Sequence, residues 1–166
     1  MPLIDALLQE LEQEAQTTRR VLERVPSDRL SWRPHAKART LGELALHVAT
    51  VPGAVAELSL KSPAQAPEFG PDPTPASAAD LLPALNNSLA QANKALGGMD
   101  DGTATATWRL MRGDRELFAI PRVAFLRTVM LNHWYHHRGQ LSVYLKELNV
   151  PIPSIYGPSA DENPFT

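Results

Sequence analysis

The chain has 166 residues, 43% hydrophobic and 20% charged, a composition typical of a globular protein and sufficient for a single domain over residues 1–166. Its formal net charge of −2, with no basic run interleaved with aromatic residues, argues against binding to nucleic acid, which needs a positive surface. The sequence contains no cysteine, which excludes disulfides, thiolate metal ligands and a cysteine nucleophile.

The N-terminal stretch MPLIDALLQELEQEAQ does not resemble a targeting segment. It carries acidic residues where a signal peptide has positive charge followed by an unbroken apolar run. The sequence has no run of about 18 apolar residues, the length needed to span a membrane. We therefore expect a cytoplasmic protein that does not associate with membranes.

Two helices, each with one apolar face, are predicted in the first third of the chain. The first ends at Pro26, and the residues on its inner face recur at steps of three and four. They are Ile4, Leu7, Leu8, Leu11, Ala15, Thr18, Leu22 and Val25. The second begins at Thr40, which has the capping-box spacing to Glu43. Its apolar face comprises Leu41, Leu44, Ala45, Val48 and Val51. Pro52 removes a backbone donor, so either this helix kinks or a new one starts there.

A proline-rich stretch over residues 61–77 predicts an ordered or semi-rigid loop rather than a domain linker. Ser77 and Asp80 resemble the start of a third helix, which Gly97-Gly98 would end. Its apolar stripe comprises Leu82, Leu85, Leu89, Ala92 and Leu96. Residues 99–120 are the least helical part of the chain, and Gly113-Asp114 predicts the turn of a short hairpin.

A last helix is predicted from Pro121, which suits a first helical turn, to about Leu148, before Asn149 and Pro151. Four amphipathic helices with one apolar stripe each indicate an all-α fold, a four-helix bundle with long connections on either side of the third helix.

Histidines lie on the apolar stripe of this last helix. The stripe steps by three and four through Leu126, Met130, His133, His137, Leu141, Tyr144 and Leu148. His133 and His137 are one turn apart on the same side, a separation at which two imidazoles can share one metal ion. His136 could pair with His133 instead, and spacing alone does not exclude it, although His137 lies nearer the centre of the stripe.

His47 lies close to the apolar face of the second helix, and inward side chains of two helices in a bundle can meet at one level. His35, in a polar loop, is expected at the surface. A histidine on an apolar face is more often a hydrogen-bonded core residue than a ligand, and a bare HxxxH is a weak signal. Trp134 also stands where the HExxH motif of zinc proteases has its glutamate. Spacing alone therefore leaves core packing and metal binding both open.

Three segments in the same order resemble the DinB-like (DinB/YfiT) superfamily. LSWRPHAKARTLGELALHV is similar to the approach to its first histidine, NHWYHHRGQLSVYL to its HxxxHRGQ signature, and LNVPIPSIYGPSADE to its usual ending. The resemblance implies an up-down-down-up four-helix bundle, often a homodimer. It also implies a divalent transition metal (nickel, zinc or iron) held by His47, His133 and His137.

Three neutral imidazoles would leave a metal ion with a coordination position for water or substrate, as in catalytic zinc sites. By resemblance, we expect an enzyme that activates a small thiol or water, similar to the thiol S-transferases of the family. Since the chain has no cysteine, a low-molecular-weight thiol would be a small-molecule substrate. The alternative is a bundle without catalysis, in which the ion stabilises the fold or a dimer.

The neighbouring residues have simpler explanations. Glu43 is expected in the helix cap rather than as a base. Tyr144 and Trp134 are candidates for the lining of the pocket, and both are adequately explained as core residues. Arg138 and Gln140 are expected off the centre of the stripe, in structural or interface roles. Gly139 is unfavourable inside a helix by about 1 kcal/mol and would permit close packing by another helix or subunit.

Overall fold

The long helices follow the predicted apolar stripes closely. In a computed structural model that describes residues 1–68 and 70–165, α1 covers Leu3–Leu22, α2 Leu41–Ser59 and α3 Leu81–Leu96. Short 3-10 turns occupy Ser27–Arg29 and Ala78–Asp80. The predicted loop over residues 61–77 contains Phe69, which, like Thr166, lies outside the described residues.

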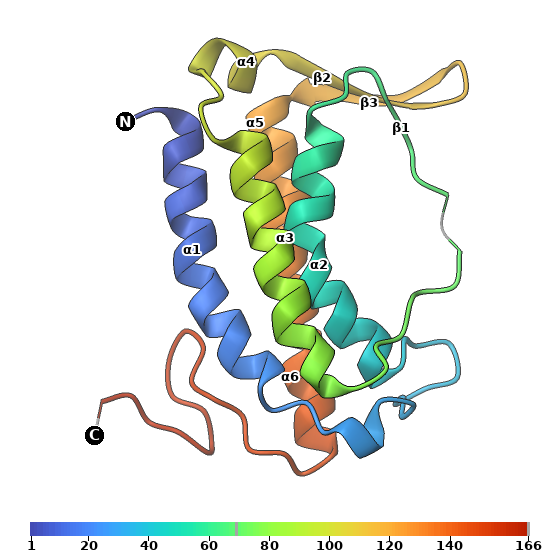
Figure 1. The fold of residues 1–166 in the computed structure, drawn as a ribbon, viewed down its shortest axis with the longest axis vertical. Coiled ribbons are helices and arrows are strands. Elements are labelled where there is room, and N and C mark those ends of the chain that lie inside the picture. Colours follow the sequence, from blue (N-terminus) through green and yellow to red (C-terminus); the bar gives the residue numbers. More distant parts are fainter. Residues whose placement is uncertain (69, 166) are drawn as a thin grey trace.

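The last helical run is continuous but changes type along its length. It comprises α5 (Arg122–Phe125), the π-helical stretch η3 (Leu126–Asn132) and α6 (His133–Glu147). A left-handed residue, Asn149 with φ of 58°, follows its end, as predicted. In Figure 1 this run lies alongside α1, α2 and α3, and the buried apolar residues of all four segments form one core. The up-down-down-up order of the bundle stays a prediction.

Helix α2 passes through Pro52 without ending, because side chains of two other helices replace the missing backbone hydrogen bonds. Pro52 has no N–H to donate to the Val48 carbonyl, which instead accepts the indole N–H of Trp134 at 2.7 Å. The Gly53 N–H donates to Ser88 Oγ on α3 at 2.8 Å. A Cβ on Gly53 would lie 2.7 Å from the Ser88 carbonyl oxygen, so glycine permits this close approach. The sequence left a kink and the start of a new helix open at Pro52, and the structure has one helix that continues through it.

Among the described residues, α2 is the one helix long and apolar enough to cross a membrane by length and composition. An apolar stretch of this kind also occurs in the core helices of globular proteins. In this structure 56% of it is buried within the protein, where α2 packs against α3 and α6.

A small sheet departs from the expected all-α fold. Strands β2 (Thr107–Arg112) and β3 (Arg115–Pro121) form the predicted hairpin, with Gly113 at φ of 57° in its turn. The short strand β1 (Ala64–Gln65) adds parallel to β2 and extends the sheet. The fold is therefore mostly helical with a three-stranded sheet, and the all-α prediction is wrong in this respect.

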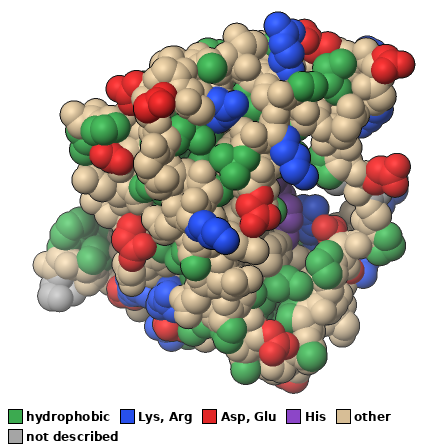
Figure 2. All heavy atoms as spheres, turned by 45° about the horizontal axis from the view of Figure 1, so that its top comes forward, with side chains coloured by type: hydrophobic (Ala, Val, Ile, Leu, Met, Phe, Trp, Pro, Cys, Tyr) green, Lys and Arg blue, Asp and Glu red, His purple; other side chains and the backbone are tan. Residues whose placement is uncertain are grey.

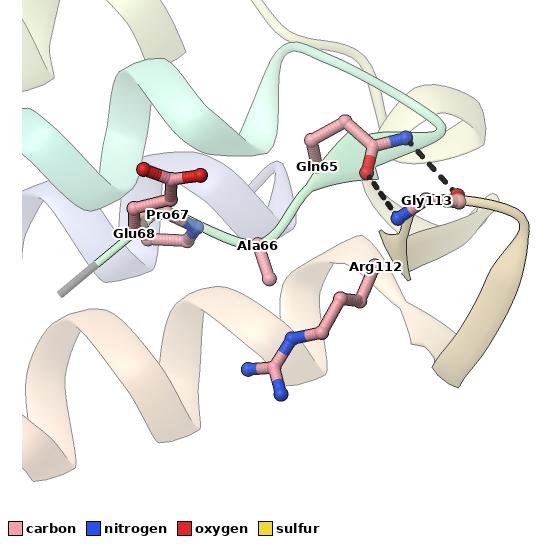
Figure 3. A pocket seen from close by; sticks show the side chains of 6 residues that line it. All are labelled: Gln65, Ala66, Pro67, Glu68, Arg112 and Gly113. Atoms are coloured by element: carbon pink, nitrogen blue, oxygen red, sulfur yellow. Dashed lines mark hydrogen bonds between the residues drawn. The ribbon is translucent and has the colours of Figure 1, made fainter.

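The sheet lies across one end of the helices, next to the short helix α4 (Asp101–Thr105) (Figure 1). Figure 3 shows how the proline-rich segment is tied to the hairpin: the Gln65 amide accepts the Gly113 N–H at 3.1 Å and donates to its carbonyl at 3.4 Å. Trp108 of β2 stacks on Phe125 of α5, with ring centroids 3.8 Å apart, and forms a second, smaller core beneath the sheet.

The buried face of α6 differs from the predicted one. Its buried residues are Trp134, His137, Arg138, Leu141 and Leu145. Since a π-helical turn bonds i to i+5 rather than i+4, the η3 stretch shifts the following residues by about one position relative to regular helical spacing. His133 and His137 therefore lie on the flank of α6 that faces α2, rather than at the centre of the core stripe.

Replacing Trp134 by Phe should destabilise the protein by about 1–3 kcal/mol, because it leaves the Val48 carbonyl buried without a donor. Urea denaturation measures the change in unfolding free energy. Trp32→Phe is the matched control, since Trp32 is only partly buried and its ring packs on Tyr144. Equal effects of the two substitutions would contradict this role for the indole.

Candidate metal centre

Three histidines from two helices converge in the middle of the protein. His47 comes from the second turn of α2, while His133 and His137 come from the first two turns of α6. Their ring centroids are 4.5 Å apart for His47 and His137, 4.5 Å for His133 and His137, and 5.3 Å for His47 and His133. One ring nitrogen of each lies within 4.8 Å of the other two.

Hydrogen bonds on the outer side of two rings fix which nitrogen faces inward. His133 Nδ1 lies 3.2 Å from the Val129 carbonyl oxygen, and His137 Nδ1 lies 2.7 Å from Gln140 Oε1. Both partners are acceptors, so each neutral ring carries its proton on Nδ1 and a lone pair on Nε2. The two Nε2 atoms are 2.8 Å apart. Two facing lone pairs repel each other, and a shared cation would relieve this repulsion.

His47 contributes a third nitrogen to the same point. Its Nε2 is buried and has no hydrogen-bond partner among the described residues. Such an orphaned atom is costly unless something else binds it. A tetrahedral ion at 2.0–2.1 Å from its ligands would hold their nitrogens about 3.3 Å apart, which lies between the 2.8 Å of the His133–His137 pair and the 4.8 Å within which all three nitrogens lie. The donor set and its geometry therefore fit a divalent transition-metal ion.

Burial keeps all three imidazoles neutral. It lowers the pKa of His47 to about 3, with a further contribution from the nearby Arg39 guanidinium. Burial also lowers the pKa of His137 to about 4, although the hydrogen bond to Gln140 opposes it. The pKa of His133 is lowered by burial too, partly offset by its bond to Val129. Neutral rings are the form that binds metal.

An ion pair lies beside the cluster and was not predicted from the sequence. Arg39 immediately precedes the N-cap of α2, and its guanidinium binds both carboxylate oxygens of Asp72, at 2.7 and 3.2 Å. Asp72 comes from the proline-rich loop, and the bond to Arg39 lowers the pKa of its carboxyl. Arg39 lies in the segment that resembles the family's approach to its first histidine, but Asp72 lies in no motif, and only folding of the loop brings the two together.

Two hollows meet at the histidines, and Arg39 lines both. One, of about 420 Å³, is lined by polar groups that include Lys37, Asp72 and Gln140, and it reaches His137. The other, of about 590 Å³, is mainly apolar and reaches His47 and His133. Figure 2 shows histidine (purple) deep in a hollow with Lys or Arg (blue) and Asp or Glu (red) side chains beside it.

A larger hollow of about 780 Å³ lies elsewhere, between the proline-rich segment and the hairpin turn (Figure 3). Its described lining residues include Glu68 and Arg112 but none of the histidines. Convergent groups with perturbed pKa values mark a functional site better than size does. We therefore place the candidate site at the histidine cluster.

The other residues singled out from the sequence do not belong to the histidine cluster. His136 is exposed and flanks His137, with ring centroids 5.0 Å apart, and His35 is exposed in its loop. Glu43 forms the capping box with Thr40, as predicted. Tyr144 lines the polar hollow beside His137.

Of two signature residues beside the histidines, Arg138 has a structural role and Gly139 lies exposed. Arg138 was predicted off the centre of the stripe, in a structural or interface role; its side chain is only 1% exposed and lies on the buried face of α6, so the position is wrong, while the role is structural. Its guanidinium binds Glu14 and Thr18 of α1 and the hydroxyl of Tyr156, joining α6 to α1 and to the C-terminal segment. Gly139 lies on an exposed face of α6, where an added Cβ would meet open space among the described residues rather than a closely packed helix. The homodimer expected from the resemblance stays a prediction.

Comparisons with known proteins identify the family and several similar chains. The model of the DinB family matches residues 1–164. The uncharacterized protein YrdA of Bacillus subtilis (strain 168) is 28% identical over 163 residues, which cover 96% of this chain and 91% of that protein.

Solved structures show the same fold. A DinB-like protein from Bacillus cereus ATCC 10987 is 26% identical, with a TM-score of 0.71 over 92% of this chain and 97% of that one. A DinB-like protein from Bacillus subtilis is 17% identical, with a TM-score of 0.68 over 90% and 96% of the two chains.

Stability of the metal-free protein should fall as the pH is lowered from about 6.5 towards 4. Histidine in the unfolded chain titrates near 6.5, whereas the buried rings take up protons only at lower pH, so acid favours the unfolded state. Urea denaturation at pH 7 and pH 5 measures this difference. His47→Gln should reduce the pH dependence and His35→Gln, at the surface, should not; the same dependence in all three proteins would contradict the assignment.

Proposed function

The chain belongs to the DinB family, and from that membership and its three converging histidines we propose that the protein binds one divalent transition-metal ion through His47, His133 and His137 and uses it to activate a small thiol or water. The proposed ion is nickel, zinc or iron, since neutral imidazoles suit these metals. The reaction class is that of a thiol S-transferase or a hydrolase.

One observation supports the metal more than any other. Three neutral imidazole nitrogens point at one place, two of them with their lone pairs fixed inward and the third buried without a partner. Core histidines that only pack would each find a hydrogen-bond partner. Binding of a cation by all three explains why His47 has none among the described residues.

When bound, an ion with three imidazole ligands supplies Lewis acidity that favours the deprotonated form of a water or thiol beside it. The chain's own residues orient the ligands and set the charge around them. Val129 and Gln140 hold the rings of His133 and His137 in the required tautomer. Arg39 adds positive charge that favours an anionic reactant, and Asp72 holds its guanidinium in position. No cysteine competes for the site, so a reacting thiol arrives as a substrate.

The alternative is a structural role for the ion, and the position of the ligands on two helices is compatible with it. An ion bound to His47 and to the pair on α6 would link two helices that already pack together. The two hollows beside the histidines favour catalysis, because a purely structural site is normally closed by protein.

Protein purified without a metal-affinity tag should contain about one transition-metal ion per chain by elemental analysis. His47→Ala and His137→Ala should lose it, whereas His136→Ala, which changes the exposed neighbour, should retain it. Gln140→Leu should weaken binding by about 10–100-fold, because it frees the ring of His137. Equal metal contents of the wild type and the His47→Ala variant would refute the proposed site.

Thiol binding distinguishes a catalytic metal site from a structural one. Cobalt-substituted protein should develop a thiolate-to-metal charge-transfer band when small cellular thiols are added, because the three ligands leave room for a fourth. His136→Ala should show the same band. If no thiol or anion changes the spectrum while removal of the metal unfolds the protein, the catalytic proposal is wrong and the structural one holds.

A further inference from the structure

The apolar hollow beside the histidines extends along α2, with polar residues at one end and apolar residues along the rest. Its volume of about 590 Å³ lies within the range of small-molecule sites. It is bounded by α2, by the α5–η3 stretch, by the β2–β3 hairpin and by Pro67 of the proline-rich segment. Its apolar lining residues are Val51, Ala54, Val55, Leu58, Pro67, Leu110, Phe118, Phe125 and Val129.

The polar lining residues gather at the end where the histidines lie. They are Arg39, His47, Thr50, Thr128 and His133. From His47 the lining face of α2 continues through Val51 and Val55 to Leu58, a rise of about 16 Å at 1.5 Å per residue. A molecule lying along α2 would therefore meet polar groups at one end and apolar groups along the rest of its length.

The far end of the hollow has a firm aromatic wall. Phe118 and Phe125 line it, and both rings contact Trp108, with centroids 5.9 and 3.8 Å away. Trp108 is fully buried beneath the sheet. Because Phe125 is buried and stacks on the buried Trp108, this part of the wall would stop a ligand of excessive length rather than yield to it, whereas Phe118, 37% exposed, lies at the solvent edge of the wall.

We propose that this hollow binds the apolar body of an amphipathic small molecule, an alkyl or aryl chain whose single anionic head lies at His47 and His133. The position of the head rests on the proposed function, since a bound cation would attract it, together with the positive charge of Arg39 at the same end. The chain itself would be held by apolar contact along α2 and the hairpin. The polar hollow that reaches His137 is left for a hydrophilic co-reactant.

A homologous series of straight-chain carboxylates from butanoate to decanoate tests this assignment on the zinc-loaded protein. Affinity measured by calorimetry should rise about fourfold per methylene, as expected when each methylene is buried, and should level off once the chain reaches the aromatic wall. The fluorescence of Trp108, measured as the difference between the wild type and a Trp108→Phe variant because the chain has three tryptophans, should change with the longer members, since the Trp108 ring contacts both phenylalanines of that wall. Affinity that does not depend on chain length would overturn the proposal.

Two variants test where the chain lies. Ala54→Trp places a large ring in the hollow, so affinity should stop rising at a shorter chain length. Ala90→Trp is the matched control, an exposed alanine on α3 that lines none of the hollows described above, and it should behave as the wild type. Identical series for the two variants would show that the carboxylates bind elsewhere and would refute the assignment.

Removing the metal distinguishes this inference from the proposed function. A chelator should lower the affinity of every carboxylate by a similar factor, because only the head loses its partner, while the gain per methylene persists. If the chelator leaves the affinities unchanged while affinity still rises with each methylene, the metal site alone is contradicted. If the chelator lowers the affinities but affinity does not rise with each methylene, the binding hollow alone is contradicted.

Discussion

The structure depends most on holding three uncharged imidazole nitrogens towards one another inside a helical core. Burying these polar rings has a desolvation cost, and two Nε2 lone pairs 2.8 Å apart add repulsion. Outer hydrogen bonds to Val129 and Gln140 fix two of the rings so that their Nε2 atoms face each other, and the Nε2 of His47 has no partner among the described residues. A bound cation would turn this unfavourable arrangement into a favourable one, which is why the cluster is better explained as a ligand set than as packing.

Two irregular stretches of helix bring the ligands to the same level. Pro52 interrupts the backbone hydrogen bonds of α2 one turn after His47, and Trp134, next to His133, donates to the carbonyl that proline leaves free. The π-helical stretch η3 then ends at the residue before His133 and sets the direction in which both histidines of α6 point. Such stretches cost stability and are frequent at functional sites. The same contacts that complete α2 thus align it with α6.

The positions of the long helices, the capping box of Thr40 and Glu43, the hairpin at Gly113 and the convergence of the three histidines could be predicted from the sequence, because each rests on local spacing or on a family motif; metal binding by the histidines stays a prediction. The shift of the buried face of α6 could not, since a π-helical turn leaves no periodic signal and regular spacing was assumed through it. Arg39 and Asp72 could not be paired either, because they are 33 positions apart, on either side of α2, and the proline-rich loop that carries Asp72 has no periodic pattern from which its path could be predicted. The position of Arg138 was predicted wrongly for the same reason, since regular helical spacing was assumed through η3.

X-ray absorption of the zinc-loaded protein tests the central claim most directly, because it counts the imidazoles bound to the ion without relying on the fold. Three imidazole nitrogens at about 2.0–2.1 Å, with one further light ligand not supplied by the protein, are expected. A shell without imidazole scattering, or one in which a fourth side chain completes the coordination, would contradict a three-histidine site that is open to substrate.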